Sequence, residues 1–217
     1  MYSCKSFFFI ATALLLGISG CGSFPNSTQP LASSISSAAS AIPSIDPQSE
    51  QLFQKGLTAY ESFNYNEAIF FYDKSLSIDK NNYKALSGKG IALAMQGNEN
   101  NSTQDITSGI ALIKSALQKN PNYVAAFYDL ALALKINKNY DESIYWFQKV
   151  IQKEPDNTWS YYGIATIYGD KGQAKEAVTY LKKAMSLDNI NVKQAARTQS
   201  HFDSIRSDPA FKSLINE

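Results

Sequence analysis

Apolar residues recur with a helical period from residue 49 to residue 191, and small residues recur among them at a nearly fixed spacing. Gly56, Gly90, Ala131 and Ala165 lie 34, 41 and 34 residues apart, each inside an apolar stretch. The middle interval equals 34 plus 7, which indicates one unit with a seven-residue insertion. The pattern therefore predicts four repeated units, each built from helices.

Each unit contains a second small residue, and it ends at a helix-breaking or polar position. Ala68, Ser143 and Ala177 follow the first small residue of their units by 12 residues, whereas Gly109 follows by 19, again seven late. Small residues on both helices of a hairpin let the two backbones approach closely, so the spacing needs no catalytic explanation. The residues at which the units end are Lys80, Pro121, Pro155 and Asn189.

With these positions in place, residues 49 to 191 resemble the tetratricopeptide repeat (TPR) family. The resemblance implies an all-α fold, a right-handed superhelix of about four helix-turn-helix repeats, with a capping helical segment at the carboxyl end. The repeats are expected at residues 49–82, 83–123, 124–157 and 158–191, and the cap at 192–217. The polar run from Gly97 to Asp105 carries the insertion, and we interpret it as a solvated loop.

The first segment of the chain has the pattern of a secretion signal. Residues 7 to 18 form an apolar run without charge, which is too short to span a bilayer but has the length of a signal-peptide core. Ile18, Ser19, Gly20 and Cys21 then resemble the lipobox of bacterial lipoproteins, which implies removal of residues 1–20 and lipidation of Cys21. An ordinary signal peptide with an incidental cysteine, or an uncleaved short anchor, remains the alternative.

Residues 21–48 are predicted to form a flexible tether behind the lipidated cysteine. The stretch is rich in Ser, Ala and Pro and has too little apolar periodicity to build a core. A flexible chain of this length would hold the folded domain on the order of 30 Å from the lipid. We expect a location in the bacterial cell envelope, on the outer face of the cytoplasmic membrane or in the outer membrane.

The charge balance and the cysteines narrow the possible functions. Lys and Arg total 20 against 19 acidic residues, so the chain lacks the positive field that binding to nucleic acid requires. Cys4 and Cys21 are the only cysteines, and both precede the repeats. The folded part must therefore hold together by packing, without a disulfide or a thiolate metal ligand.

The family resemblance places a ligand on the concave face, which is lined by the first helix of each repeat. The twelve residues carried over to this groove, to which a partner peptide or protein would bind, are Phe53, Leu57, Tyr60, Lys84, Ser87, Ile91, Tyr128, Leu132, Lys135, Trp159, Tyr162 and Thr166. The expected groove is aromatic with two lysines, and Trp159 is its strongest candidate anchor. The Asn, Lys and Arg clamp with which some relatives bind a terminal carboxylate is not recognisable.

No catalytic or metal-binding motif accompanies the repeats. His201 is the one histidine, and it falls in the capping segment, where a triad or a metal site would have to form around a single imidazole. The run from Asn98 to Asp105 lacks the alternating carboxylates of a calcium loop. We therefore expect no enzyme activity, no cofactor and no metal.

The sequence as a whole predicts a membrane-anchored scaffold or adaptor that binds proteins at the cell envelope. Two alternatives stay open. The groove aromatics could stack on sugar rings in a carbohydrate-binding or cell-wall-binding module, or the chain could be a self-assembling structural protein.

Overall fold

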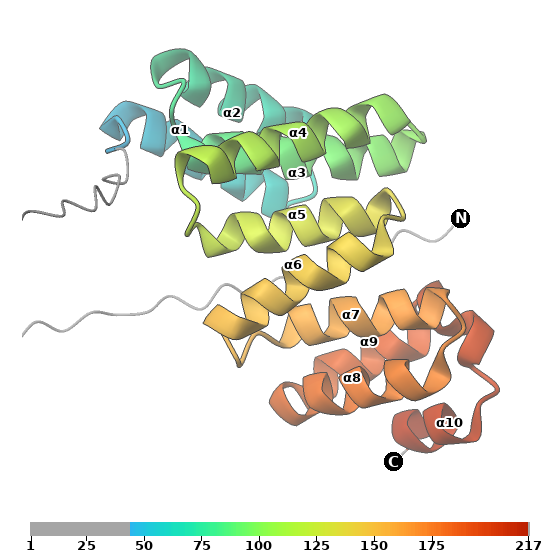
Figure 1. The fold of residues 1–217 in the computed structure, drawn as a ribbon. Coiled ribbons are helices and arrows are strands. Elements are labelled where there is room, and N and C mark those ends of the chain that lie inside the picture. The colour runs from blue at the N-terminus through green and yellow to red at the C-terminus, as the bar shows by residue number, and fades with distance from the viewer. Residues whose placement is uncertain (1–43, 217) are drawn as a thin grey trace, which may run out of the picture. The chain divides into compact units, whose positions relative to one another are not determined.

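A computed structural model describes residues 44–216, and every regular element in this range is a helix. Ten α-helices and one 3-10 helix follow in order (Figure 1). The helices are α1 (Pro47–Glu61), α2 (Tyr65–Ile78), α3 (Tyr83–Asn100), α4 (Thr103–Lys119), α5 (Val124–Ile136), α6 (Tyr140–Lys153), α7 (Thr158–Asp170), α8 (Ala174–Leu187), α9 (Asn189–Thr198), η1 (Ser200–Ile205) and α10 (Pro209–Asn216).

The first eight helices form four hairpins that pack in sequence, and α9, η1 and α10 close the carboxyl end (Figure 1). Within each hairpin the two helices pack against one another, and each hairpin also contacts the next. Consecutive first helices meet as well, since α3 packs against α1 and α5. The fold is thus an all-α solenoid of four helical pairs with a helical cap, as the resemblance to tetratricopeptide repeats implies.

Polar residues fix where several helices begin. The Asp46 carboxylate accepts hydrogen bonds from the backbone amides of Gln48 and Ser49 at the start of α1. Asn64, Asn82 and Asn157 cap α2, α3 and α7 in the same way. These side chains satisfy amides that have no partner within the first turn of a helix, so the helix boundaries follow from local sequence.

The turn inside each hairpin contains one residue in the left-handed region. Phe63, Lys138 and Gly172 hold equivalent turn positions with φ of 60°, 60° and 71°. Asn101 has φ of 57° in the second hairpin. Glycine adopts this conformation without a steric penalty, whereas a bulky residue such as Phe63 adopts it at a cost.

The small repeat residues lie where helices come closest. A side chain on Gly56 or Gly88 would collide with the Tyr72 ring, and one on Gly163 would collide with Phe147. In the second hairpin, Gly90 of α3 and Gly109 of α4 bring their backbones into direct contact. The bulky ring of one hairpin therefore fills the space that glycines on the first helices leave open.

A buried polar cluster ties the first three helices together. Ser49, Ser75 and Asn82 are all fully buried on α1, on α2 and at the start of α3. The Ser75 hydroxyl donates to the Ser49 carbonyl oxygen at 2.7 Å, and the Asn82 amide donates to the Ser49 hydroxyl at 2.9 Å. Each polar group has a partner, so the cluster can be buried without a large desolvation penalty.

The interpretation of the polar run from Gly97 to Asp105 as a loop is wrong. Helix α3 continues to Asn100 and α4 begins at Thr103, so only two residues lie between them. Ser102 caps α4, because its hydroxyl accepts a hydrogen bond from the Asp105 amide at 3.3 Å. The extra residues lengthen both helices, which have 18 and 17 residues against 13 to 15 in the other hairpins.

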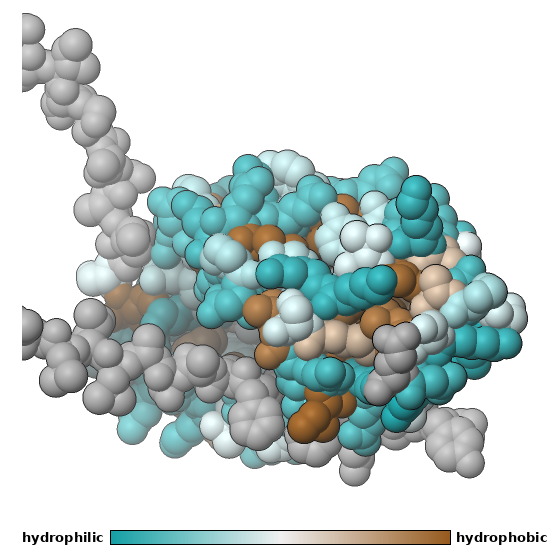
Figure 2. Space-filling model, turned by 90° about the horizontal axis from the view of Figure 1, so that it is seen from below, coloured by the Kyte–Doolittle hydropathy of each residue, from teal (hydrophilic) through white to brown (hydrophobic). Residues whose placement is uncertain are grey.

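The cap extends the core of the fourth hairpin. Phe202 of η1 and Phe211 of α10 are fully buried, stack with ring centroids 5.4 Å apart, and pack with Val192 of α9 against α7 and α8. Figure 2 views the molecule from the side of α8 and α10, where hydrophilic residues cover most of the face and hydrophobic ones show between them. The cap begins earlier than residue 192, since α9 starts at Asn189.

The signal segment 1–20, Cys21 and the tether as far as residue 43 lie outside the described residues. The end of the predicted tether is structured, because α1 begins at Pro47 behind its Asp46 cap. Among residues 44–216, no helix combines the length and the apolar character that a membrane span requires.

Candidate functional site

The twelve groove residues predicted from the sequence divide into two groups by exposure. Buried among the core residues are Phe53, Ser87, Ile91, Tyr162 and Thr166. Partly exposed along the first helices are Leu57, Tyr60, Lys84, Tyr128, Leu132, Lys135 and Trp159. A partner can contact the partly exposed group directly, whereas the buried group packs beneath the surface.

Both groove lysines have partners within the chain. The Lys84 ammonium lies 2.9 Å from the Glu50 carboxylate of α1, and Gln54 donates to the same carboxylate oxygen at 2.9 Å. The Lys135 ammonium lies 3.1 Å from Nε2 of His201. The Glu50 carboxylate offsets the charge of Lys84, whereas the contact with His201 leaves the charge of Lys135 in place.

An acidic residue that the sequence reasoning missed lies between the first helices. Asp129 of α5 is partly exposed, and its Oδ2 accepts a hydrogen bond from the Ser87 hydroxyl of α3 at 2.7 Å. Burial raises the pKa of Asp129 to about 7, while the hydrogen bond from Ser87 acts to lower it. The available signal was a single acid, flanked by Tyr128 and Leu130, in the mostly apolar helix α5.

The charge of Asp129 acts on tyrosines of several elements. Burial raises the pKa of Tyr60, and the negative charge of Asp129 raises it further. The same two causes, in the same order, raise the pKa of Tyr72, Tyr123 and Tyr128. These four side chains come from α1, α2, the start of α5 and α5 itself, and their raised pKa keeps them protonated at neutral pH.

The first helices of the four hairpins, α1, α3, α5 and α7, form a row. At the carboxyl end of this row, the cap covers aromatic residues of α7. The Tyr162 hydroxyl donates to Oε1 of Gln199 at 2.8 Å, and its ring centroid lies 5.9 Å from that of Phe202. Trp159 packs edge-on against Tyr162 at 5.5 Å and stays partly exposed. Tyr128 of α5 does not join this pair, because it packs edge-on against Phe147 at 5.6 Å.

His201 has a structural setting. Its Nδ1 lies 2.8 Å from the Asp170 carboxylate at the end of α7, and its Nε2 faces Lys135 of α5. The ring thereby joins the cap to two first helices. Within residues 44–216, no group of three or more His, Cys, Asp or Glu residues is arranged to hold a metal ion.

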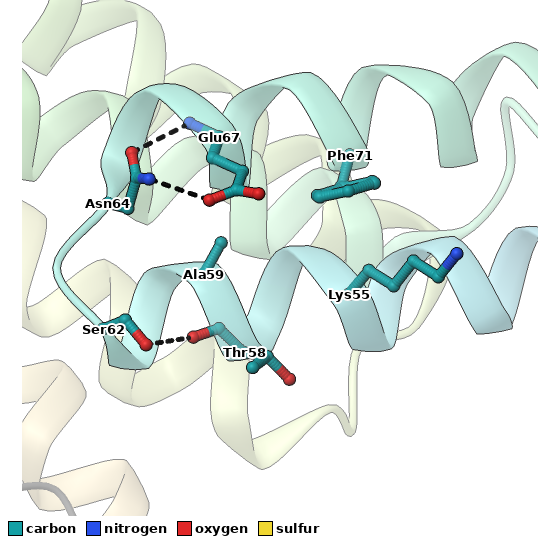
Figure 3. Close-up of a pocket in the computed structure, with 7 residues that line it drawn as sticks. All are labelled: Lys55, Thr58, Ala59, Ser62, Asn64, Glu67 and Phe71. Carbon is teal, nitrogen blue, oxygen red and sulfur yellow. Dashed lines mark hydrogen bonds between the residues drawn. The ribbon is translucent and has the colours of Figure 1, made fainter.

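An open pocket of about 470 Å³ lies between α1 and α2 (Figure 3). Asn64 donates to the Glu67 carboxylate at 2.8 Å and accepts from the Glu67 amide, while the Ser62 hydroxyl donates to the Thr58 carbonyl. These polar groups satisfy one another as turn and cap contacts.

Comparison with known proteins identifies the repeats. The family model described as Tetratricopeptide repeat matches residues 52–82 and 160–191, which fall on the first and fourth hairpins. The chain therefore carries tetratricopeptide repeats.

Solved structures share the same fold. MamA 41-end from Desulfovibrio magneticus RS-1 is 19% identical with a TM-score of 0.56, over 80% of this chain and 96% of that chain. The MamA RS-1 ArsTM double mutant is 20% identical with a TM-score of 0.55, over 80% and 97%. YrrB, described as a TPR protein with an unusual peptide-binding site, is 13% identical with a TM-score of 0.51, over 76% and 81%. At these identities the likeness shows the fold.

Proposed function

We propose that this chain is a lipid-anchored TPR scaffold that binds a peptide segment of a partner protein at the bacterial cell envelope, without catalysing a reaction. The observation that carries the binding proposal is the row of partly exposed side chains on the first helices, chiefly Leu57, Tyr60, Tyr128 and Leu132. Rigid aromatic side chains on a preformed surface lose little entropy when a partner binds.

The fold and its relatives support this function. A helical solenoid presents an extended surface that suits an extended or helical peptide. The structure described for YrrB is that of a TPR protein with a peptide-binding site. The covered position of Tyr162 narrows the proposed contact surface, so we place the peptide mainly along α1, α3 and α5, with Trp159 at the carboxyl end of its path.

Capture of partners tests the binding proposal. Crosslinking in cells followed by mass spectrometry should recover one or a few envelope proteins with the native chain. Replacing Tyr60 and Tyr128 together by Ala should weaken capture about thirtyfold or more, which corresponds to roughly 2 kcal/mol for the loss of central aromatic contacts. Trp159→Ala should weaken it as well.

The matched control is Tyr145→Ala, which removes an exposed tyrosine from α6, a second helix of its hairpin. It should leave capture unchanged. If the double variant captures the same proteins as well as the native chain does, the groove is not the binding surface. Retention on cell-wall glycan that depends on the same two tyrosines would instead favour the carbohydrate-binding alternative.

The anchor is proposed from the sequence alone, on the string Ile18, Ser19, Gly20 and Cys21. Two or three acyl chains bury enough methylene groups to make attachment effectively permanent, at about 0.8 kcal/mol each. Metabolic labelling with an acyl precursor should mark the native chain and leave Cys21→Ser unlabelled. Label on the variant, or none on the native chain, would rule the anchor out.

A further inference from the structure

We propose that Asp129 is the site at which the groove binds a cationic group of its partner, the ammonium of a lysine or the guanidinium of an arginine, with Ser87 orienting the carboxylate and tyrosines surrounding the cation. The inference rests on the proposed function, since it names the chemistry of one position of the bound peptide. It predicts a basic residue in the partner peptide, whereas the sequence predicted an aromatic groove with two lysines.

The geometry holds the carboxylate in one orientation. The 2.7 Å hydrogen bond from Ser87 joins α3 to α5 and occupies one lone pair of Oδ2. Within residues 44–216, Ser87 is the hydrogen-bond donor found for this carboxylate. An ionised carboxylate accepts about four hydrogen bonds, and the described residues 44–216 supply this one. Asp129 is partly exposed, and a ligand in the groove can reach it.

The charge of Asp129 is not balanced by the described part of the chain. The groove lysines engage Glu50 and His201 instead. The hydrogen bond from Ser87 is the one interaction in residues 44–216 that lowers the pKa of Asp129, and burial outweighs it. A desolvated carboxylate is costly unless it is paired, and a cation from the partner would pair it.

The surroundings suit an organic cation. Tyr60, Tyr123 and Tyr128 are near enough for the charge of Asp129 to raise their pKa. An ammonium or guanidinium is attracted both to the face of an aromatic ring and to a carboxylate. A metal ion is not favoured, because no cluster of three or more ligating residues exists within residues 44–216. A purely structural bond between α3 and α5 would need no charge, since asparagine could accept the same hydrogen bond from Ser87.

The test uses the full chain with n-butylammonium and methylguanidinium as probes of the two side chains. Carbon-13 NMR of the Asp129 carboxyl group follows its titration between pH 4 and pH 9, with and without saturating probe. The cation should lower the pKa of Asp129 by about one unit or more, because it stabilises the ionised form. Neutral n-butanol should leave the pKa unchanged.

The affinity of the probe should depend on pH in one direction. It should fall about tenfold for each pH unit below the pKa of Asp129, since protonation removes the charge that binds the cation. Asp129 accepts a hydrogen bond from Ser87 of α3, and its charge acts on Tyr60, Tyr72, Tyr123 and Tyr128 of α1, α2 and α5. With their raised pKa, the tyrosines stay neutral throughout, so the profile reports the carboxyl group.

Three variants separate the site from general effects of charge. Asp129→Asn should abolish probe binding and its pH dependence, and Ser87→Ala should weaken binding while keeping the pH dependence. Asp141→Asn removes an acid whose side chain is 96% exposed on α6 and should change neither. Equal binding of n-butylammonium by Asp129→Asn, or an Asp129 titration that neither probe moves, would overturn the proposal. Partner capture that survives those results would leave the scaffold function standing.

Discussion

The two ends of the row of first helices differ in how their residues affect the stability of the fold. At the carboxyl end, α7 lies against η1, and Tyr162 is covered by Gln199 and Phe202. Nearer the amino end, Asp129 of α5 accepts a hydrogen bond from Ser87 of α3, and burial raises its pKa to about 7. The first region gains stability from an apolar core that the cap completes. The second keeps a group that costs stability at neutral pH.

The difference between the two regions indicates that the partner binds near Asp129 rather than at the capped end. Features that lower stability persist in a protein where they serve a function, and interiors otherwise favour apolar packing. Residues in the capped region should therefore behave as structural supports, and replacing them should destabilise the fold. Replacing Asp129 should have the reverse effect, so stability measurements can distinguish the two regions.

The largest effect is expected in the cap. Phe202→Ala should destabilise the protein by about 3 to 5 kcal/mol, because a fully buried ring in contact with Tyr162 and Phe211 would leave a cavity. Urea unfolding followed by circular dichroism measures the change. Phe70→Ala, at a ring that is 52% exposed on α2, should cost less than about 1 kcal/mol. Similar losses for the two variants would mean that the cap does not complete the core.

Asp129→Asn should stabilise the protein at pH 8 by roughly 1 to 3 kcal/mol and leave it nearly unchanged at pH 4. The folded pKa of Asp129 is raised to about 7, so its contribution to stability is complete at low pH and is lost as pH rises through that value. Unfolding at both pH values measures the difference. Asp141→Asn should show no such dependence, and a variant that is less stable at pH 8 would show that the charge supports the fold.

Ser102→Ala should cost about 1 kcal/mol, because it removes the side-chain acceptor that caps α4. Thermal unfolding provides the measurement. Ser77→Ala is the comparison, since that serine lies in the last turn of α2 and its hydroxyl donates to the Lys74 carbonyl. Equal stability of the two variants would show that the extended second hairpin does not depend on its cap.

The smallest effect is expected at the turn of the first hairpin. Phe63→Gly should stabilise the protein by roughly 0.5 to 1 kcal/mol, because glycine tolerates the φ of 60° that phenylalanine adopts at a cost. Gly172→Ala, at the equivalent turn, should destabilise by a similar amount. If Phe63→Gly instead weakens the fold, the ring, which is 39% exposed, contributes packing that outweighs its backbone strain.

The repeats could be predicted because their signal is local. The spacing of Gly56, Ala131 and Ala165 follows from close helix packing, which every hairpin needs, and the polar turns follow from capping. The loop predicted from Gly97 to Asp105 failed because polar residues also suit the exposed surface of a helix, and the Ser102 cap was overlooked.

The site was less predictable because its chemistry joins residues from different repeats. Ser87 and Asp129 are 42 positions apart, and nothing in either helix alone indicates that they meet. The covering of Tyr162 likewise depends on Gln199 and Phe202 of the cap, which a pattern within one repeat cannot show. The family resemblance predicts which positions line the groove. Their exposure depends on which other residues of this chain pack against them.

The buried cluster of Ser49, Ser75 and Asn82 has a mechanical consequence. If the amino-terminal anchor we propose holds the chain at a membrane while a partner pulls on the groove, tension enters the fold at α1. The hydrogen bonds of the cluster join the first turn of α1 to α2 and to the start of α3, so they would carry that load together. These hydrogen bonds would then oppose the separation of α1 from α2 and α3, and the force would reach the other hairpins through α3.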